Sequence, residues 1–155
     1  SNLLLAQKLF DDMRIMRPQA WLDWQLMEEG NNEWCVLRGN FKTQEYKVIK
    51  TYMPHANHPL LQTRLHLYRD GKRRDTCRPL PTGKELVIAV LNTTETDSPL
   101  VIDLDKFAGK IASVSNWRTS ETEDCQSFQA VKVKGKKLDY TRPAKSLTTF
   151  VINLK

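Results

Sequence analysis

The stretch Trp21-Leu22-Asp23-Trp24-Gln25 is the most informative segment of this chain, because it has the pattern of a β-strand with an indole on each face. Side chains alternate along a strand, so Trp21, Asp23 and Gln25 share one face, and the other face is apolar. A sugar ring stacks its C–H face on an indole, while its hydroxyl groups exchange hydrogen bonds with carboxylates and amides. The polar face therefore suits a sugar, although two tryptophans in one strand are also compatible with an ordinary core.

The composition indicates a globular protein of ordinary domain size. The chain has 155 residues, of which 40% are hydrophobic and 27% charged, which fits neither a disordered segment nor a membrane protein. No apolar run approaches the ~20 residues that span a bilayer, so we expect no membrane span. The N-terminal residues lack the basic region of a signal peptide, and they enter an amphipathic helix at once. We therefore expect the chain to begin within something larger.

The charges, cysteines and histidines point to no nucleic-acid, cofactor or metal partner. Much of the net charge of +6 lies in two runs, 72–74 and 132–137, each beside a glycine in a turn context. Charged hairpin ends are commonly solvated, and a nucleic-acid surface would interleave its basic residues with aromatics. Three scattered cysteines form neither a disulfide framework nor a zinc site. His55 and His58 flank prolines without a carboxylate or thiol nearby, which a metal site would require.

The first third of the chain is predicted to form helix, strand and helix. Apolar residues recur at helical spacing over 3–17, and Pro18 ends that helix because the residue before a proline avoids the helical region. A strand over 19–27, a loop over 28–32 and a short strand over 33–37 follow. The stripe Tyr46, Ile49 and Met53 favours a second helix over 43–53. The prolines and histidines of 54–59 mark the best domain boundary, which divides the chain into 1–56 and 57–155.

The remaining two thirds are predicted to be all β. A hairpin begins at 65–69, and strands follow at short spacing with turn residues between them. The predicted strands are 85–92, 100–104, 111–117, 128–133, 138–141 and 146–154. Among them, 86–91 is a continuous apolar run, which fits a strand buried on both faces. This order of elements indicates an antiparallel β-sandwich.

The order of these elements resembles the C-terminal end of retaining glycoside hydrolases of family 30, which include glucosylceramidase and microbial β-glycanases. Those enzymes end a (β/α)8 barrel with a strand similar to 21–25, and a helix then leads into a side sandwich. The other resembling segments are Leu86 to Asn92, Trp117 to Ser120, and Pro143 to Ile152. Residues 53–59 depart from the family's pattern at the junction. The resemblance implies a barrel remnant over 1–56, a sandwich over 57–155, and a secreted, periplasmic or lysosome-like compartment.

The resemblance also implies that this chain is not catalytic by itself. Retaining glycosidases need two carboxyl groups ~5 Å apart. In this family both are glutamates, at the ends of barrel strands four and seven, whereas residues 19–27 would be strand eight. No glutamate of this chain matches either motif, and Glu28 and Glu29 are adjacent in a predicted loop, where they are more simply solvated. The chain would then supply one wall of a site for β-linked glycans, through Trp21, Asp23 and Gln25.

Two further expectations follow. Elements cut from a barrel leave apolar faces and unpaired strand edges, so we expect self-association. The alternative function is a stand-alone carbohydrate-binding or structural β-sandwich module. An exposed indole on the sandwich, at Trp34 or Trp117, would favour that alternative, and an indole in a groove at Trp21 would favour the barrel. We expect Trp34 and Trp117 to pack between the two layers.

Overall fold

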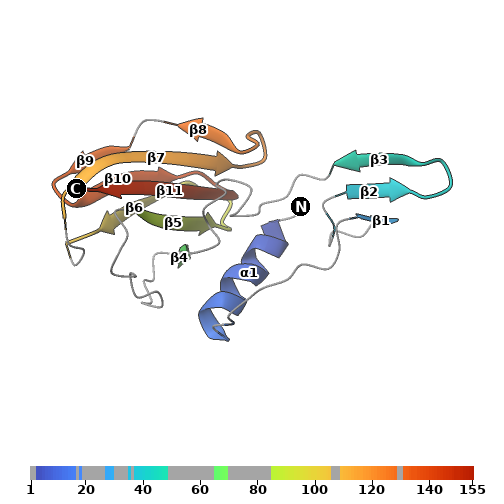
Figure 1. Ribbon diagram of the computed structural model, residues 1–155, viewed down its shortest axis with the longest axis horizontal. Coiled ribbons are helices and arrows are strands. Elements are labelled where there is room, and N and C mark those ends of the chain that lie inside the picture. The colour runs from blue at the N-terminus through green and yellow to red at the C-terminus, as the bar shows by residue number, and fades with distance from the viewer. Residues whose placement is uncertain are drawn as a thin grey trace. The chain divides into compact units, whose positions relative to one another are not determined.

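The computed structural model describes residues 3–16, 18, 27–29, 35, 37–48, 65–69 (backbone only), 85–105, 109–128 and 131–155. The chain divides into two compact units, Ser1–Tyr52 and Met53–Lys155 (Figure 1). The described elements of the first unit are α1 (Leu3–Ile15), β1 (Met27–Glu29), β2 (Leu37–Asn40) and β3 (Glu45–Val48). Those of the second unit are β4 (Leu65–Arg69), β5 (Glu85–Asn92), β6 (Ser98–Asp103), β7 (Ile111–Thr119), β8 (Gln126–Phe128), β9 (Lys132–Lys134), β10 (Lys137–Arg142) and β11 (Ser146–Leu154).

The predicted first helix is confirmed as α1. Its buried side chains are Leu3, Leu5, Ala6, Leu9 and Phe10. They follow the spacing of one helical face, which is the pattern that predicted the helix. The helix was predicted to reach residue 17, but it ends at Ile15, and Met16 beyond it is 65% exposed. No helix in the described part of the chain is long and apolar enough to cross a membrane.

A three-stranded sheet follows in the first unit, in the order β1-β2-β3. Met27 pairs with Leu37 in a parallel register, and Asn40 pairs with Glu45 in an antiparallel one. The predicted strand 19–27 lies outside the described residues except for Met27. The predicted loop over 28–32 is wrong at Glu28 and Glu29, because both belong to β1. Of the short strand predicted over 33–37, Leu37 begins β2, Cys35 is outside any strand, and the other residues lie outside the described part of the chain.

The second helix, predicted over 43–53, is wrong at Glu45–Val48, which form strand β3. A tight turn over 41–44 reverses the chain before any helix can begin. The side-chain Oδ1 of Asn40 accepts hydrogen bonds from the backbone N–H groups of Lys42 (3.0 Å) and Thr43 (3.2 Å). The N–H of Gln44 donates to the Asn40 carbonyl at 2.8 Å. Asparagine favours such turns because its side-chain oxygen accepts hydrogen bonds from backbone N–H groups a few residues further on, as a carbonyl oxygen does in a backbone turn.

The second unit is a β-sandwich, as predicted. Its five-stranded sheet has the order β4-β5-β11-β7-β8, and its three-stranded sheet has the order β6-β10-β9. Neighbouring strands are antiparallel except β4 and β5, which run parallel with Leu65 opposite Val87. The predicted hairpin partner of β4 falls outside the described residues. The predicted strand 128–133 is two short strands, β8 and β9, and Gly135 makes the predicted turn between β9 and β10 with φ of 61°.

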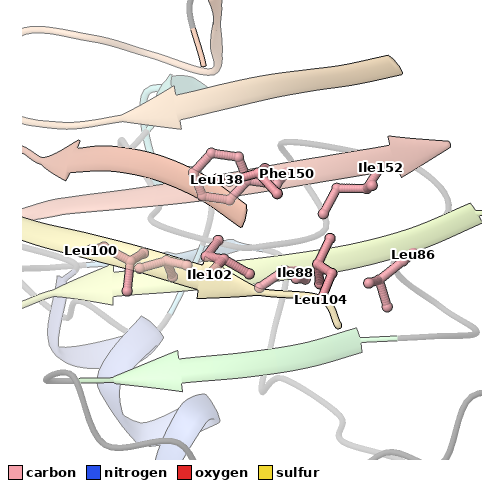
Figure 2. Packing of buried hydrophobic residues seen from close by; sticks show 9 residues of the cluster. Leu86, Ile88, Leu100, Ile102, Leu104, Leu138, Phe150 and Ile152 are labelled. Atoms are coloured by element: carbon pink, nitrogen blue, oxygen red, sulfur yellow. The ribbon is translucent and has the colours of Figure 1, made fainter. Parts of the chain in front are cut away.

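The core lies between the two sheets of the sandwich. Figure 2 shows its side chains gathered between strands of both sheets: Leu86, Ile88, Leu100, Ile102, Leu104, Leu138, Phe150 and Ile152. Phe150 is fully buried and meets Tyr140 of β10 edge to face, with ring centroids 4.9 Å apart. Every residue from Leu86 to Asn92 is buried, so β5 is covered on both faces, as its continuous apolar run predicted.

Trp117 does not lie between the two layers, contrary to expectation. It pairs with Thr149, whereas the preceding residue, Asn116, pairs with the core residue Phe150. Trp117 therefore belongs to the opposite face of the five-stranded sheet, where it packs partly buried against Val87 and Val151. Trp34 lies outside the described residues.

Candidate functional site

The predicted site residues Trp21, Asp23 and Gln25 lie outside the described residues. The described chain resumes directly after them, in β1. There the side chains of Glu28 and Glu29 alternate between the two faces of the strand, with Glu28 half-buried and Glu29 exposed. Arg38 of β2 is the cross-strand neighbour of Glu28. The two carboxylates therefore do not face one substrate together.

A cavity of about 220 Å³ lies on the hairpin beside β1. Its lining comes from β1, β2, β3 and the turn between the last two strands: Met27, Gly39, Asn40, Phe41, Gln44, Glu45 and Tyr46. All of these residues belong to the first compact unit. The hairpin and its parallel neighbour therefore supply all of the described lining.

The lack of a side chain at Gly39 shapes this cavity. Gly39 pairs with Tyr46 across the hairpin. A Cβ atom at Gly39 would lie 2.9 Å from Sδ of Met27 and 3.5 Å from Cε1 of Phe41. The glycine therefore lets Met27 lie close over β2. Phe41 and Tyr46 stand beside this floor with 58% and 70% of their surfaces exposed.

The polar groups of the cavity come from the turn. Oδ1 of Asn40 is engaged with the turn backbone, and one carboxylate oxygen of Glu45 accepts a hydrogen bond from the Thr43 hydroxyl at 3.0 Å. Gln44 adopts φ of 60°, a left-handed conformation that a non-glycine residue rarely takes. Gln44 is one of the residues that line the cavity. Its amide can both donate and accept hydrogen bonds.

The segment that resembles the family at Trp117 to Ser120 has a structural role in the sandwich. Arg118 forms a two-point ion pair with Glu123, through Nε to Oε2 at 2.5 Å and through Nη2 to Oε1. Its Nη1 donates to the Tyr140 hydroxyl of the other sheet at 3.1 Å, and its guanidinium lies 4.0 Å from the centroid of the Phe128 ring. The hydrogen bonds to Glu123 raise the pKa of Arg118 above its ordinary value. The Arg118 side chain therefore links the two sheets of the sandwich.

The asparagine that ends β5 has a similar structural role. Asn92 is 1% exposed, and its Nδ2 donates to the carbonyl groups of Pro143 (2.8 Å), Thr96 (3.0 Å) and Arg142 (3.3 Å). Its Oδ1 accepts from the hydroxyl and the N–H of Thr94 at 2.7 and 3.1 Å. Asn92 therefore ties β5 to the turn between β10 and β11. Two of the segments that carry the sequence resemblance are thus explained by the folding of the sandwich.

Among the residues that the structure describes, no group of three or more His, Cys, Asp or Glu could hold a metal ion. His55 and His58 lie outside that part of the chain. The expectation of no cofactor stays a prediction from the sequence.

Solved structures with a similar fold are known. No family model and no curated protein matches the chain. Among solved structures, it is similar to a glycoside hydrolase family 30 subfamily 8 xylanase from Clostridium acetobutylicum, with 20% identity over 97% of this chain and a TM-score of 0.67. It is also similar to the catalytic domain of a family 30 xylanase from Talaromyces cellulolyticus, with 15% identity over 99% of this chain and a TM-score of 0.66.

The chain has the fold of part of a family 30 glycoside hydrolase. It spans 38% of the Clostridium chain and 35% of the Talaromyces chain. The resemblance inferred from the motifs is thereby confirmed for the fold.

Sequence reasoning missed the cavity on the hairpin. A helix over 43–53 would put Tyr46 on a packed stripe and would leave no hairpin for Phe41 and Gln44 to line. The available signals were Asn40 with the polar residues 42–44 shortly after it, and the alternation of Tyr46 with Val48, which has the period of a strand.

Proposed function

We propose that this chain is the C-terminal portion of a retaining O-glycoside hydrolase of the family 30 type, which acts on β-linked glycans. The observation that carries the proposal is the likeness in fold to a family 30 xylanase over 97% of this chain. Residues 1–56 would then be the end of the barrel and residues 57–155 the side sandwich. The segment 19–27 would be the last barrel strand, with Trp21, Asp23 and Gln25 facing the sugar.

By itself the chain is proposed to be non-catalytic. A retaining mechanism needs two carboxyl groups about 5 Å apart on one substrate. Glu28 and Glu29 are neighbours on one strand, and their side chains leave it on opposite faces. This geometry supports a role as one wall of a sugar site without the reacting groups.

Two measurements on the purified chain test this proposal. Reducing-end release from xylan and from β-glucan should stay at the level of buffer, and Glu28→Gln and Glu29→Gln should leave it there. Binding of β-xylo-oligosaccharides, followed by calorimetry, should weaken about tenfold in Trp21→Ala, the size of effect expected from the loss of about 1.4 kcal/mol. Trp24→Ala, on the opposite face of the same predicted strand, is the control and should affect stability instead. Hydrolysis that Glu28→Gln or Glu29→Gln abolishes would refute the non-catalytic role.

The stand-alone binding module is the weaker candidate. It needs an indole open to solvent on the sandwich, whereas Trp117 rests partly buried on Val87 and Val151. Self-association stays a prediction. Exposed apolar side chains at Leu4 and Ile15 would favour it, and light scattering across a range of concentrations checks it.

A further inference from the structure

The cavity on the β2–β3 hairpin has the chemistry of a second sugar subsite. We propose that it holds a single pyranose ring of a β-linked glycan, so this inference rests on the proposed function. The described lining residues combine two exposed aromatic rings with amide and carboxylate groups, and none of these described residues is basic. A neutral ligand with many hydroxyl groups fits that combination better than an anion does.

The size of the cavity points to one ring. Sites for drug-sized ligands are commonly about 300–1,000 Å³. The volume here, about 220 Å³, lies below that range. A single monosaccharide unit is therefore the appropriate occupant, and the rest of a glycan would extend beyond the cavity.

The aromatic rings supply the stacking surface. Large aromatic side chains are usually well buried, yet Phe41 and Tyr46 keep 58% and 70% of their surfaces open beside the same cavity. Tyr46 pairs with Gly39, and the absence of a side chain there lets Met27 lie close over the strand as the apolar floor beside the two rings. A sugar ring has flat C–H faces that suit contact with such rings, and the tyrosine hydroxyl adds a polar end.

Gln44 supplies the second argument. Its left-handed backbone is unfavourable for a residue with a Cβ atom, and glycine would adopt it without that cost. Non-glycine residues in that region gather at functional sites, where the surrounding structure holds them. The turn bond from Gln44 N–H to the Asn40 carbonyl holds this conformation, and Gln44 lines the cavity, where its amide is proposed to meet a sugar hydroxyl.

The experiment uses the full chain and β-1,4-xylo-oligosaccharides of two to six units, with cello-oligosaccharides in parallel, titrated by calorimetry. Phe41→Ala and Tyr46→Ala should each weaken binding of the longer oligosaccharides about tenfold, which corresponds to about 1.4 kcal/mol. Gln44→Gly should weaken binding about threefold while its melting temperature stays equal or rises, because glycine relieves the backbone. That pairing separates loss of a contact from loss of folding.

Val48→Ala is the matched control. Val48 is on the same strand as Tyr46, two residues on and therefore on the same face, and it is 64% exposed without lining the cavity. It should leave the affinity within twofold.

The outcomes separate the two proposals. Binding that Trp21→Ala weakens but Phe41→Ala and Tyr46→Ala leave unchanged overturns the subsite and spares the proposed function. If Phe41→Ala and Tyr46→Ala weaken binding and Trp21→Ala does not, the result supports the subsite and refutes the predicted sugar contact of Trp21. Equal losses of affinity in Val48→Ala and Tyr46→Ala would show that the ligand contacts the whole strand edge, as a peptide partner does. That result would overturn the subsite. A chain that is folded by circular dichroism and binds none of these glycans overturns both proposals.

Discussion

Replacing Glu123 by glutamine removes the carboxylate that holds Arg118 between the layers of the sandwich. The two side chains are each 17% exposed, so the pair is largely shielded from water. The Ser120 hydroxyl also donates to Oε2 of Glu123 at 2.8 Å, which fixes the carboxylate for its bond to Arg118. Glu123→Gln keeps the shape of the side chain and leaves the guanidinium without its negative partner.

The expected cost follows from the burial of this pair. Removing one partner of a buried ion pair costs about 3–5 kcal/mol, because the other charge stays behind uncompensated. Arg118 keeps its bond to the Tyr140 hydroxyl and its contact with the Phe128 ring. Since these contacts and partial exposure soften the loss, we expect the free energy of unfolding to fall by about 2–3 kcal/mol.

Urea denaturation, followed by circular dichroism at 25 °C, measures this change. Glu121→Gln is the control, because its side chain is 68% exposed and its ion pair with Lys145 spans 3.8 Å. That control should change the free energy of unfolding by less than about 0.5 kcal/mol. Arg118→Met and the double variant complete a cycle whose coupling energy isolates the pair. A loss in Glu123→Gln no larger than in Glu121→Gln would show that this ion pair does not fasten the sheets.

Three other predictions concern the second unit. Asn92→Asp should destabilise the fold by about 3 kcal/mol, because a carboxylate would face carbonyl groups that now accept from the amide, and chemical denaturation checks it. Phe150→Ala should cost about 3–5 kcal/mol by the same assay. Its control is Val101→Ala, at a position 55% exposed, which should lower the free energy of unfolding by less than about 0.5 kcal/mol. Burial, and next the charge of Asp124, raise the pKa of the Cys125 thiol. Fewer thiolates then form at pH 8, so its alkylation, followed by mass spectrometry of its peptide, should be slower than that of free cysteine and faster in Asp124→Asn.

Local patterns predicted the sandwich well, because each strand there follows one rule along the sequence. The run Leu86 to Leu91 has no polar residue, which already requires cover on both faces. Gly135 takes a positive φ between two strands, as its charged turn indicated. What local patterns could not predict is pairing between distant segments. The parallel alignment of β4 with β5 joins residues about twenty positions apart through a connection that the sequence does not specify.

The hairpin shows why the site was harder to predict than the fold. Tyr46, Ile49 and Met53 have helical spacing, and the same segment also alternates as a strand does. The hydrogen bonds of Asn40 decide between the two, and they depend on a turn whose geometry only the structure shows. Trp117 illustrates a related limit. Its strand was predicted, yet the register with β11 decides which face it occupies.

We proposed that a sugar-binding surface lies in the first unit of the chain. A titration of the 15N-labelled chain with β-1,4-xylohexaose, followed by assigned amide chemical shifts, tests this proposal most directly. We expect saturable shifts at residues 21–27 and 39–46, with the amides of β5 and β11 unchanged. Shifts confined to the sandwich around Trp117, or no shift in any segment at millimolar sugar, would contradict it.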